Sequence, residues 1–567
     1  MRRSLRPLAV VVAIVALTVA AGARRWRPVD ALTSKAAPKT LVASIRAEPQ
    51  SFNRYTSRDF TGNVLTYLMH ASLVRVNRAT NQIEPELAER WELLENRSYR
   101  LYLRRDVRFS DGTLFTAADV VFSFQAIYDP KSASALAETL QVQSKPLKVS
   151  AEDATTIRVE FPTPFAPGLR MLDGVPIYPR HLLEPSLADG SFRKVWGTTT
   201  APSNLSGLGP FVLAKYEPGQ RLTFNRNPYY WRRNEGLPRL DHVVLDILPD
   251  QTSESLRLAT GAIDMTQSEV RPADARSFKR AVDSGALSMV DSGIGLDGDL
   301  FWINLQQARK RDPRSAWLQH ADFRRAIAAS VDRSDFADVV YLGEAVVADS
   351  IISPGNRQWH AATPPPAFDP DAARQLLAGL GLVDRHGTGM LEDRHGTPVR
   401  FTLLTQSGNT SLERGADVIK KDLKRVGIHV DVVALERSAM IDYVLRGRYD
   451  AAYFRLLTTD ADPALNLDFW LSSGGVHIWN PVQRVPATVW ERDIDVLMNG
   501  VATELDPNRR HAMFAEVQRI VARELPVVCF AFPRLSVALN NRVVSATPAP
   551  FRPPLLWNPA VIDIRSR

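Results

Sequence analysis

The chain has 567 residues, of which 45% are apolar and 23% charged, and its formal net charge is +8 at pH 7. This length and composition predict a folded protein of two or three domains and exclude a disordered or fibrous chain. Arg2, Arg3 and Arg6 precede an apolar run and leave with it on cleavage. The remaining positive charge is mild, so we expect no nucleic-acid partner.

The N-terminus predicts export. The run Leu8 to Ala23, "LAVVVAIVALTVAAGA", follows the arginines and ends in Ala-Gly-Ala, the pattern of a secretory signal peptide. We expect cleavage after Ala23, a flexible leader over 24–39 and a periplasmic product. An uncleaved anchor is the alternative, but the run is shorter than the roughly 20 residues that span a bilayer. The single cysteine is Cys529 in "LPVVCFAF", so a lipoprotein anchor is excluded and this thiol is expected to be buried.

Further along the chain, short β-rich runs alternate with amphipathic helices. In "TAADVVFSFQAI", Thr116 and Asp119 have the spacing of a capping box. The runs 211–216 and 221–225 flank a Pro-Gly turn and predict a hairpin. A strand, helix and strand follow within 243–265. Together these signals predict an α/β protein with mixed parallel and antiparallel sheet.

The second half continues the alternation. Asp369, Pro370 and Gly381 are placed to cap, begin and stop a helix in "FDPDAARQLLAGLG". Thr410 and Glu413 are expected to start another helix, which ends at Gly427 before a strand with alternating apolar residues.

The pentapeptide Asp-Arg-His-Gly-Thr occurs twice between these two helices, at 384–388 and at 393–397. It is either a pair of turns with a strand between them or a metal loop. A calcium loop needs oxygen ligands where the first copy has His386 and Thr388. A transition-metal site needs three or four ligands, and no other histidine is close in sequence. The turn interpretation is favoured.

The common enzyme signatures are missing. "GIGLDG" at 293–298 matches the dinucleotide-binding pattern, but "DLFWINL" after it predicts a strand where that motif requires a helix. No phosphate loop, H-E-x-x-H or G-x-S-x-G is present. We therefore expect neither a catalytic site nor a cofactor nor a bound metal.

Aromatic and carboxylate residues recur in three segments of the second half. Each tryptophan taken singly is more often core than pocket, and an aspartate before proline is often a turn or cap. The functional alternative is a cleft in which a carboxylate receives a ligand amine between aromatic walls. The candidate residues are Trp302, Asn304, Asp460, Asp462, Asp468, Trp470, Trp479 and Asn480.

These segments together resemble the extracellular solute-binding proteins of peptide and nickel ABC transporters. The resemblance rests on "IRAEPQSFN", "LVRVNRATNQIEPELAERWELLENRSYRLYLRRDVRFSDGTLFTAADVVFSF", "GLGPFVLAKYEPGQRLTFNRNPYYW", "DFRRAIAASVDR" and "GEAVVADSIISP". It spans residues 40 to 560 in the same order. It implies a bilobed α/β periplasmic-binding-protein fold (type II, cluster C) with an extra domain inserted in lobe one.

The resemblance also implies domain boundaries. Lobe one is expected over 40–78, 205–290 and 520–567, the inserted domain over 79–204, and lobe two over 291–519.

A ligand site is implied as well. Peptide-binding members hold the ligand's amino group with an aspartate after a strand of lobe two, which places Asp460 or Asp462 in that role. Arg455-Leu456-Leu457 replaces the Gly-Trp that is usual upstream. In lobe one, Phe52-Asn53-Arg54 replaces the usual Leu-Asp-Pro, so Phe52 and Asn53 are expected near the ligand.

The expected function follows from the family. It is a monomeric periplasmic receptor, not an enzyme, that delivers a peptide-like ligand to the permease subunits of an ABC importer. The same fold with an oligosaccharide, haem, metal chelate or opine as ligand is the first alternative. An exported enzyme on this scaffold is the second, and fold alone does not decide between them.

Overall fold

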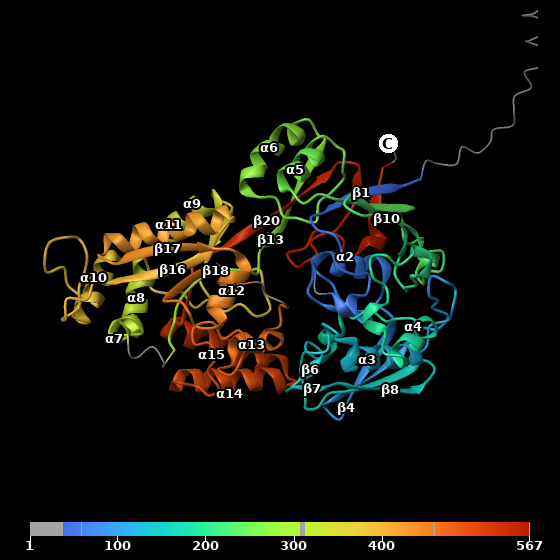
Figure 1. Cartoon of the computed structure of the whole chain (residues 1–567), viewed down its shortest axis with the longest axis horizontal. Helices are drawn as coiled ribbons and strands as arrows, with labels where there is room; N and C mark the ends of the chain where they lie inside the picture. The colour runs from blue at the N-terminus through green and yellow to red at the C-terminus, as the bar shows by residue number, and fades with distance from the viewer. Residues whose placement is uncertain (1–37, 58, 307–311, 457–459, 566–567) are drawn as a thin grey trace, which may run out of the picture.

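The computed structural model describes residues 38–57, 59–306, 312–456 and 460–565. The molecule is elongated, with helices α7, α8, α10 and α11 toward one end and strands β1 and β10 toward the other (Figure 1). The predicted cleavage site after Ala23 lies outside the described residues.

The first lobe is built on a four-stranded sheet in which β1 and β12 are parallel and the other pairs are antiparallel. Its strands, in order, are β1 (Thr40–Ile45), β12 (His242–Ile247), β11 (Arg221–Arg226) and β10 (Phe211–Glu217). Its helices are α2 (Phe60–Met69), α5 (Gln251–Ala259) and α6 (Pro272–Asp283).

A second unit lies between β1 and β10 in the sequence, at the lower right of Figure 1. Its antiparallel sheet has the order β4 (Ala88–Leu94), β5 (Ser98–Leu103), β9 (Thr156–Glu160) and β8 (Lys148–Asp153). Helices α3 (Ala117–Tyr128) and α4 (Arg180–Ala188) accompany it, with the hairpins β2 (Val74–Val76) with β3 (Ile83–Pro85) and β6 (Gln141–Val142) with β7 (Lys145–Pro146).

The second lobe contains a five-stranded sheet. The order is β17 (His429–Leu435), β16 (Arg400–Gln406), β18 (Ala451–Arg455), β14 (Asp299–Ile303) and β19 (Val527–Cys529). The helices around it are α7 (Ser315–Leu318), α8 (Ala321–Ser330), α9 (Arg333–Tyr341), α10 (Pro370–Gly379), α11 (Thr410–Arg425) and α12 (Arg437–Leu445). Below them lie α13 (Leu467–Trp470), α14 (Val489–Thr503) and α15 (Pro507–Glu524) (Figure 1).

Two neighbouring strands connect the lobes. The long strand β20 (Ala531–Asn540) pairs with β15 (Ala345–Val347) at its start and with β13 (Leu287–Ile294) along most of its length. Strand β13 continues into β14 and β19 continues into β20, so both crossings run side by side, and β19 itself pairs with β14 of the second lobe. The domain boundaries expected from the sequence stay a prediction.

Two large clusters of buried residues form the core of the molecule. One cluster of buried residues joins the first lobe, the second unit and helices α14 and α15, and another fills the second lobe around its sheet. The α/β fold class with mixed sheets is confirmed. In the part of the chain that the structure describes, no helix is both long and apolar enough to cross a membrane.

Most local predictions are confirmed. The capping box of Thr116 and Asp119 is present, and Asp369 caps α10 with Pro370 at its first position. The hairpin β10–β11 forms as predicted, with Gly219 at a φ of +73° in its turn. Thr410 is not the cap of α11, because the side chain of Asn409 accepts the backbone N–H groups of Ser411 and Leu412.

The repeated pentapeptide forms two turns, as predicted. Asp384 accepts the backbone N–H groups of His386, Thr388 and Gly389, and Asp393 accepts those of His395 and Thr397. Single β-bridges join residue 383 to 392 and residue 392 to 398. The aspartates are therefore engaged as turn formers.

Candidate functional site

A cavity of about 190 Å³ lies between the lobes. One wall comes from the first lobe, with residues of α2, the segment after β2 and the C-terminal segment. The other wall comes from the turn between β13 and β14, the end of β18 and the start of β20. The lining residues are Asn63, Arg78, Glu269, Gly295, Leu296, Asp297, Arg455, Pro533, Leu535, Pro550, Phe551 and Arg552.

Arg455, at the end of β18, is a charged residue of this wall that is held by several hydrogen bonds. Its Nε and Nη2 both donate to Oδ1 of Asp299 at 3.0 Å, and Nη2 also donates to the hydroxyl of Tyr341. Asp299 is fully buried and also accepts from the hydroxyls of Tyr341 and Tyr453. Burial raises the pKa of Asp299, and the charge of Arg455 opposes that rise. The guanidinium is thus fixed from behind.

Arg78 occupies the facing wall and is also fixed from behind. Its Nη2 donates to Asp173 and, at 2.6 Å, to the hydroxyl of Tyr67. Its Nε is buried and has no hydrogen-bond partner among the described residues. A buried donor without a partner costs free energy.

The third arginine of the lining is shared by two carboxylates. Arg552 donates from Nη1 to Asp297 at 3.2 Å and from Nη2 to Glu269 at 3.4 Å. Asp297 belongs to the "GIGLDG" turn between β13 and β14, which the sequence identifies only as a glycine-rich turn. The cavity therefore presents both signs of charge.

Asp460 lies where the second lobe meets the second unit, outside the lining of this cavity, and it is already paired. It accepts two hydrogen bonds from Arg170, at 2.9 and 3.1 Å, and Arg170 also donates to the backbone and side chain of Asn81. Burial raises the pKa of Asp460, and the nearby charge of Arg170 opposes the rise. Because Arg170 and Asn81 belong to the segment between β2 and β10, this pair links the second lobe to the second unit.

Asp462 has a different environment, in the core beneath α15. It accepts hydrogen bonds from both Nη atoms of Arg510, at 3.0 and 2.8 Å, and one from the backbone of Ala464 at 3.0 Å. Its side chain is 6% exposed and that of Arg510 is 9% exposed. Asp462 therefore acts as a buried counter-ion and helix cap.

The predicted aromatic residues are buried and do not line the cavity between the lobes. Trp302 and Trp479 belong to the core of the second lobe, whereas Phe52 and Trp470 belong to the larger core that includes the first lobe. Phe52 meets Tyr216 edge to face at a ring distance of 5.6 Å. Their expected contact with a ligand stays a prediction.

The predicted asparagines form hydrogen bonds within the protein. Asn304 donates to the backbone of Gly447 and Tyr449, and Asn53 donates to the backbone of Phe192. Asn480 donates to Gln483 and Glu491. Each of the three connects two segments of chain, so the structure gives them positions in the supporting scaffold rather than in the cavity lining.

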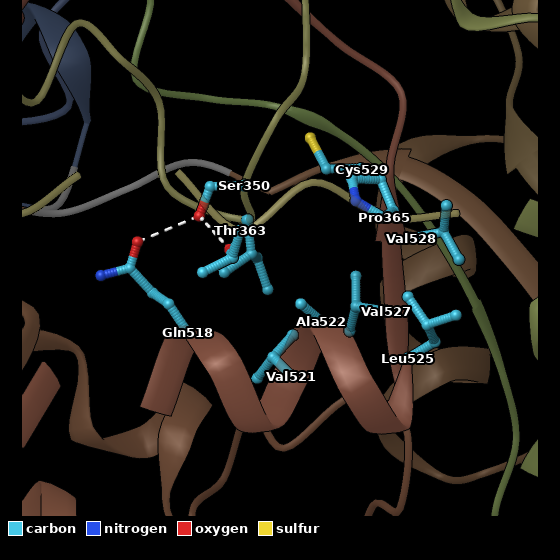
Figure 2. A pocket seen from close by; sticks show the side chains of 11 residues that line it. Ser350, Thr363, Pro365, Gln518, Val521, Ala522, Leu525, Val527, Val528 and Cys529 are labelled. Atoms are coloured by element: carbon cyan, nitrogen blue, oxygen red, sulfur yellow. Dashed lines mark hydrogen bonds between the residues drawn. The ribbon is translucent and has the colours of Figure 1, made fainter. Parts of the chain in front are cut away.

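A much smaller cavity of about 20 Å³ lies between α15 and β19, next to Cys529. Figure 2 shows Ser350 hydrogen-bonded to Gln518 and to Thr363, with the apolar side chains of α15 and β19 around them. This space is about that of a single water molecule. Cys529 is buried as expected, and burial raises its pKa well above the usual range. This cavity is too small for a ligand.

The arginines of the large cavity were missed at the level of sequence. The one signal was Arg455, which stands where the resemblance expects a glycine-tryptophan pair. Its counter-ion is 156 residues away in sequence, so no local pattern connects the two. In the described ranges, no group of histidine, cysteine and acidic side chains is arranged to hold a metal ion.

Comparison with known proteins finds relatives that are named as binding proteins and match most of the chain. A "Probable ABC transporter-binding protein" of Deinococcus radiodurans is 24% identical over 87% of this chain and 87% of its own length. A "Di/tripeptide-binding protein 2" of Pseudomonas aeruginosa is 24% identical over 90% of this chain and 92% of its own. The crystal structure of the ABC transporter substrate-binding protein CtaP of Listeria monocytogenes superposes with a TM-score of 0.76 at 20% identity, over 93% of this chain and 99% of its own.

The family itself is established by a match to the whole central part of the chain. The model of the bacterial extracellular solute-binding proteins, family 5, matches residues 82–477. This segment includes most of the second unit, the crossing from β13 to β14 between the lobes, and the loop with Asp460 and Asp462. The chain therefore belongs to the bacterial extracellular solute-binding proteins of family 5.

Proposed function

We propose that this protein is the substrate-binding component of an ABC importer, and that it captures a peptide-like ligand between its two lobes and delivers it to the permease subunits. The observation that carries the proposal is the cavity with walls from both lobes, in a chain of this family. A ligand in such a cavity contacts both lobes at once, so its binding stabilises the closed arrangement that a permease recognises.

The peptide-like ligand is supported by the relative from Pseudomonas aeruginosa, whose name is a di/tripeptide-binding protein. The cavity also has donors and acceptors of both charges, as a zwitterionic ligand requires. The proposal includes no catalytic step, because members of this family bind solutes. It includes export, cleavage after Ala23 and action as a monomer in the periplasm.

Within this proposal, Asp460 is the better placed of the two candidate amine receptors. It lies where the second lobe meets the second unit, close enough to Arg78 of the cavity lining to feel its charge, and its present partner, the guanidinium of Arg170, is a cation that a ligand ammonium can replace. Asp462 is held by Arg510 in a buried pair. If a ligand ammonium replaced Arg510 there, the guanidinium would be left buried without its carboxylate, which is costly.

The test is native mass spectrometry of the protein purified without added ligand, followed by calorimetric titration with tripeptides and with a trisaccharide of similar mass. A retained peptide, or tripeptide binding without trisaccharide binding, supports the proposal. Binding of the trisaccharide alone contradicts the peptide-like ligand and leaves the binding-protein role. Hydrolysis of the tripeptide by the protein contradicts the non-enzymatic role.

A further inference from the structure

We propose that the outer face of α14 and the loop before it contact an anionic lipid bilayer. The inference goes beyond the proposed function, because it names a second partner and does not depend on the ligand. It rests on a group of exposed valines with arginines beside them, which we call the valine surface. Its four valines are Val482, Val485, Val489 and Val496.

These valines are unusually exposed. Their exposed fractions lie between 64% and 74%, and among the large hydrophobic side chains that the structure describes, only Leu256 on α5 is as exposed. Single exposed apolar residues are normal on a protein surface, whereas a group of them marks an interaction site. All four lie within the segment 482–496, so they form such a group.

The loop and the helix form one surface. Val489 and Val496 are seven residues apart on α14 and therefore lie on the same face of this helix. The buried carboxylate of Glu491 ties the loop to the start of α14, because it accepts the side chain of Gln483 at 3.1 Å and the backbone N–H of Ala487 at 2.9 Å. Helix α14 itself lies at the lower border of the second lobe (Figure 1).

The backbone of Val482 supports a role other than folding. Its φ is +67°, in the left-handed region that β-branched residues avoid. Its side chain is the most exposed of the four, so packing contacts do not offset this strain. Strained residues of this kind cluster at functional sites.

Arginines accompany the valines. Arg484 lies in the loop, is exposed and has no hydrogen-bond or ion-pair partner among the residues that the structure describes. Arg492 lies on α14 between Val489 and Val496 in sequence and is 61% exposed. Its ion pair with the neighbouring Asp493 is long, at 3.5 Å. The valine surface therefore carries an excess of positive charge.

The end of α12 adds two more arginines at the border of this surface. The side chain of Gln306 donates to the backbone at the start of the loop, and it also lies against Gly447 just after α12. Arg446 and Arg448 flank Gly447 and are 66% and 55% exposed. Both pair with Asp442, so the surface and its border together have more arginines than paired carboxylates.

An anionic bilayer matches this combination of groups. Apolar side chains of a surface helix enter the boundary between lipid headgroups and acyl chains, and arginines beside them bind the lipid phosphates. Because headgroups are fluid, they adapt to arginines that are spread over a loop and two helices. A contact with the bilayer also brings a periplasmic receptor close to a membrane permease, as the proposed function requires.

The test is flotation with vesicles of phosphatidylcholine alone and of phosphatidylcholine with about 30% phosphatidylglycerol, at about 50 mM and about 500 mM NaCl. The valine variant carries Val485→Ser and Val496→Ser. The arginine variant carries Arg484→Gln and Arg492→Gln.

The first lobe provides the matched controls. Leu256→Ser on α5 changes an apolar side chain that is 64% exposed, and Lys279→Gln on α6 removes a cation that is 75% exposed. All the substitutions are at exposed positions, so each variant should keep the melting temperature of the parent.

We expect the parent to bind the anionic vesicles at least about tenfold more tightly than phosphatidylcholine at the lower salt concentration, and to lose most of this difference at the higher one. The valine variant and the arginine variant should each bind the anionic vesicles about tenfold more weakly than the parent. Both controls should bind them as the parent does.

The inference is wrong if the parent does not float with the anionic vesicles, if either surface variant floats as the parent does, or if the controls weaken binding as much as the surface variants. If the parent does not bind vesicles but the valine variant lowers the uptake of tri-alanine by cells, the surface contacts a protein and the bilayer contact is wrong. None of these results bears on the proposed function, which the tripeptide titrations test in solution without lipid.

Discussion

Replacing Asp462 by alanine tests whether this residue is a structural counter-ion or a ligand contact. The substitution removes two charge-assisted hydrogen bonds from Arg510 and the cap on Ala464. It leaves the guanidinium of Arg510 without its carboxylate at a site where the side chain is 9% exposed. Breaking a buried ion pair by removing one partner costs about 3 to 5 kcal/mol, so we expect the free energy of unfolding to fall by this amount.

The assay is equilibrium unfolding in urea, followed by tryptophan fluorescence. With a slope of about 3 kcal/mol per M, the loss lowers the midpoint by about 1 M or more. The double variant Asp462→Ala with Arg510→Met removes both charges and should recover most of the loss. The exposed Asp493 on α14 provides the matched control, and Asp493→Ala should change stability by less than about 0.5 kcal/mol.

Ligand affinity completes the test. If Asp462→Ala unfolds at the parental midpoint and loses tenfold or more in peptide affinity, our structural reasoning is refuted and Asp462 is the amine receptor. If Asp460→Ala instead loses that affinity with little change in stability, the amine-receptor role belongs to Asp460. N-acetylated peptides distinguish a lost amine contact from a general loss of binding.

Three further predictions follow from single features. N-terminal sequencing of the exported protein should begin at Arg24, and a start at Met1 would contradict cleavage. Changing Asp384 and Asp393 together to Asn should leave peptide affinity unchanged, and added calcium should not raise the melting temperature of the parent, because both carboxylates accept backbone N–H groups in turns. Burial lowers the pKa of His70 to about 3 in the folded protein. Between about pH 6.5 and pH 3, His70 is therefore protonated in the unfolded chain and neutral in the folded protein. The free energy of unfolding should then fall as pH drops from about 6.5 toward 3, by up to about 1.4 kcal/mol per unit from this group, and His70→Gln should lessen that fall in urea titrations at pH 6 and pH 4.

The elements that sequence predicted well depend on contacts close in the chain. The capping box at Thr116, the proline start of α10 and the hairpin β10–β11 each involve residues within one turn or one loop. Helix α11 begins at Thr410 as predicted, but its cap is Asn409, whose side-chain oxygen accepts two N–H groups while Glu413 accepts from Gly408. Asn409 and Thr410 are both favourable capping residues, so local propensity alone does not decide which of them caps the helix.

The candidate site was harder to predict, for a different physical reason. A tryptophan has the same signal in a sequence whether it fills a core or lines a pocket, and Trp302 and Trp479 fill the core. Asp460 was identified as a candidate amine receptor through the family resemblance, and that role stays a prediction. Its partner Arg170 lies 290 residues away in sequence. The charged pairs of the cavity depend on such distant contacts, which no spacing rule connects.

The side-by-side crossing of β13 and β20 limits how the protein moves. A hydrogen-bonded ladder of two strands bends readily out of its own plane, but sliding one strand along the other breaks the ladder. The connection therefore allows the lobes to bend mainly in one direction rather than to rotate freely about it. Ligands of different length would then stop the closing of the lobes at different angles, while the direction of the motion stays the same.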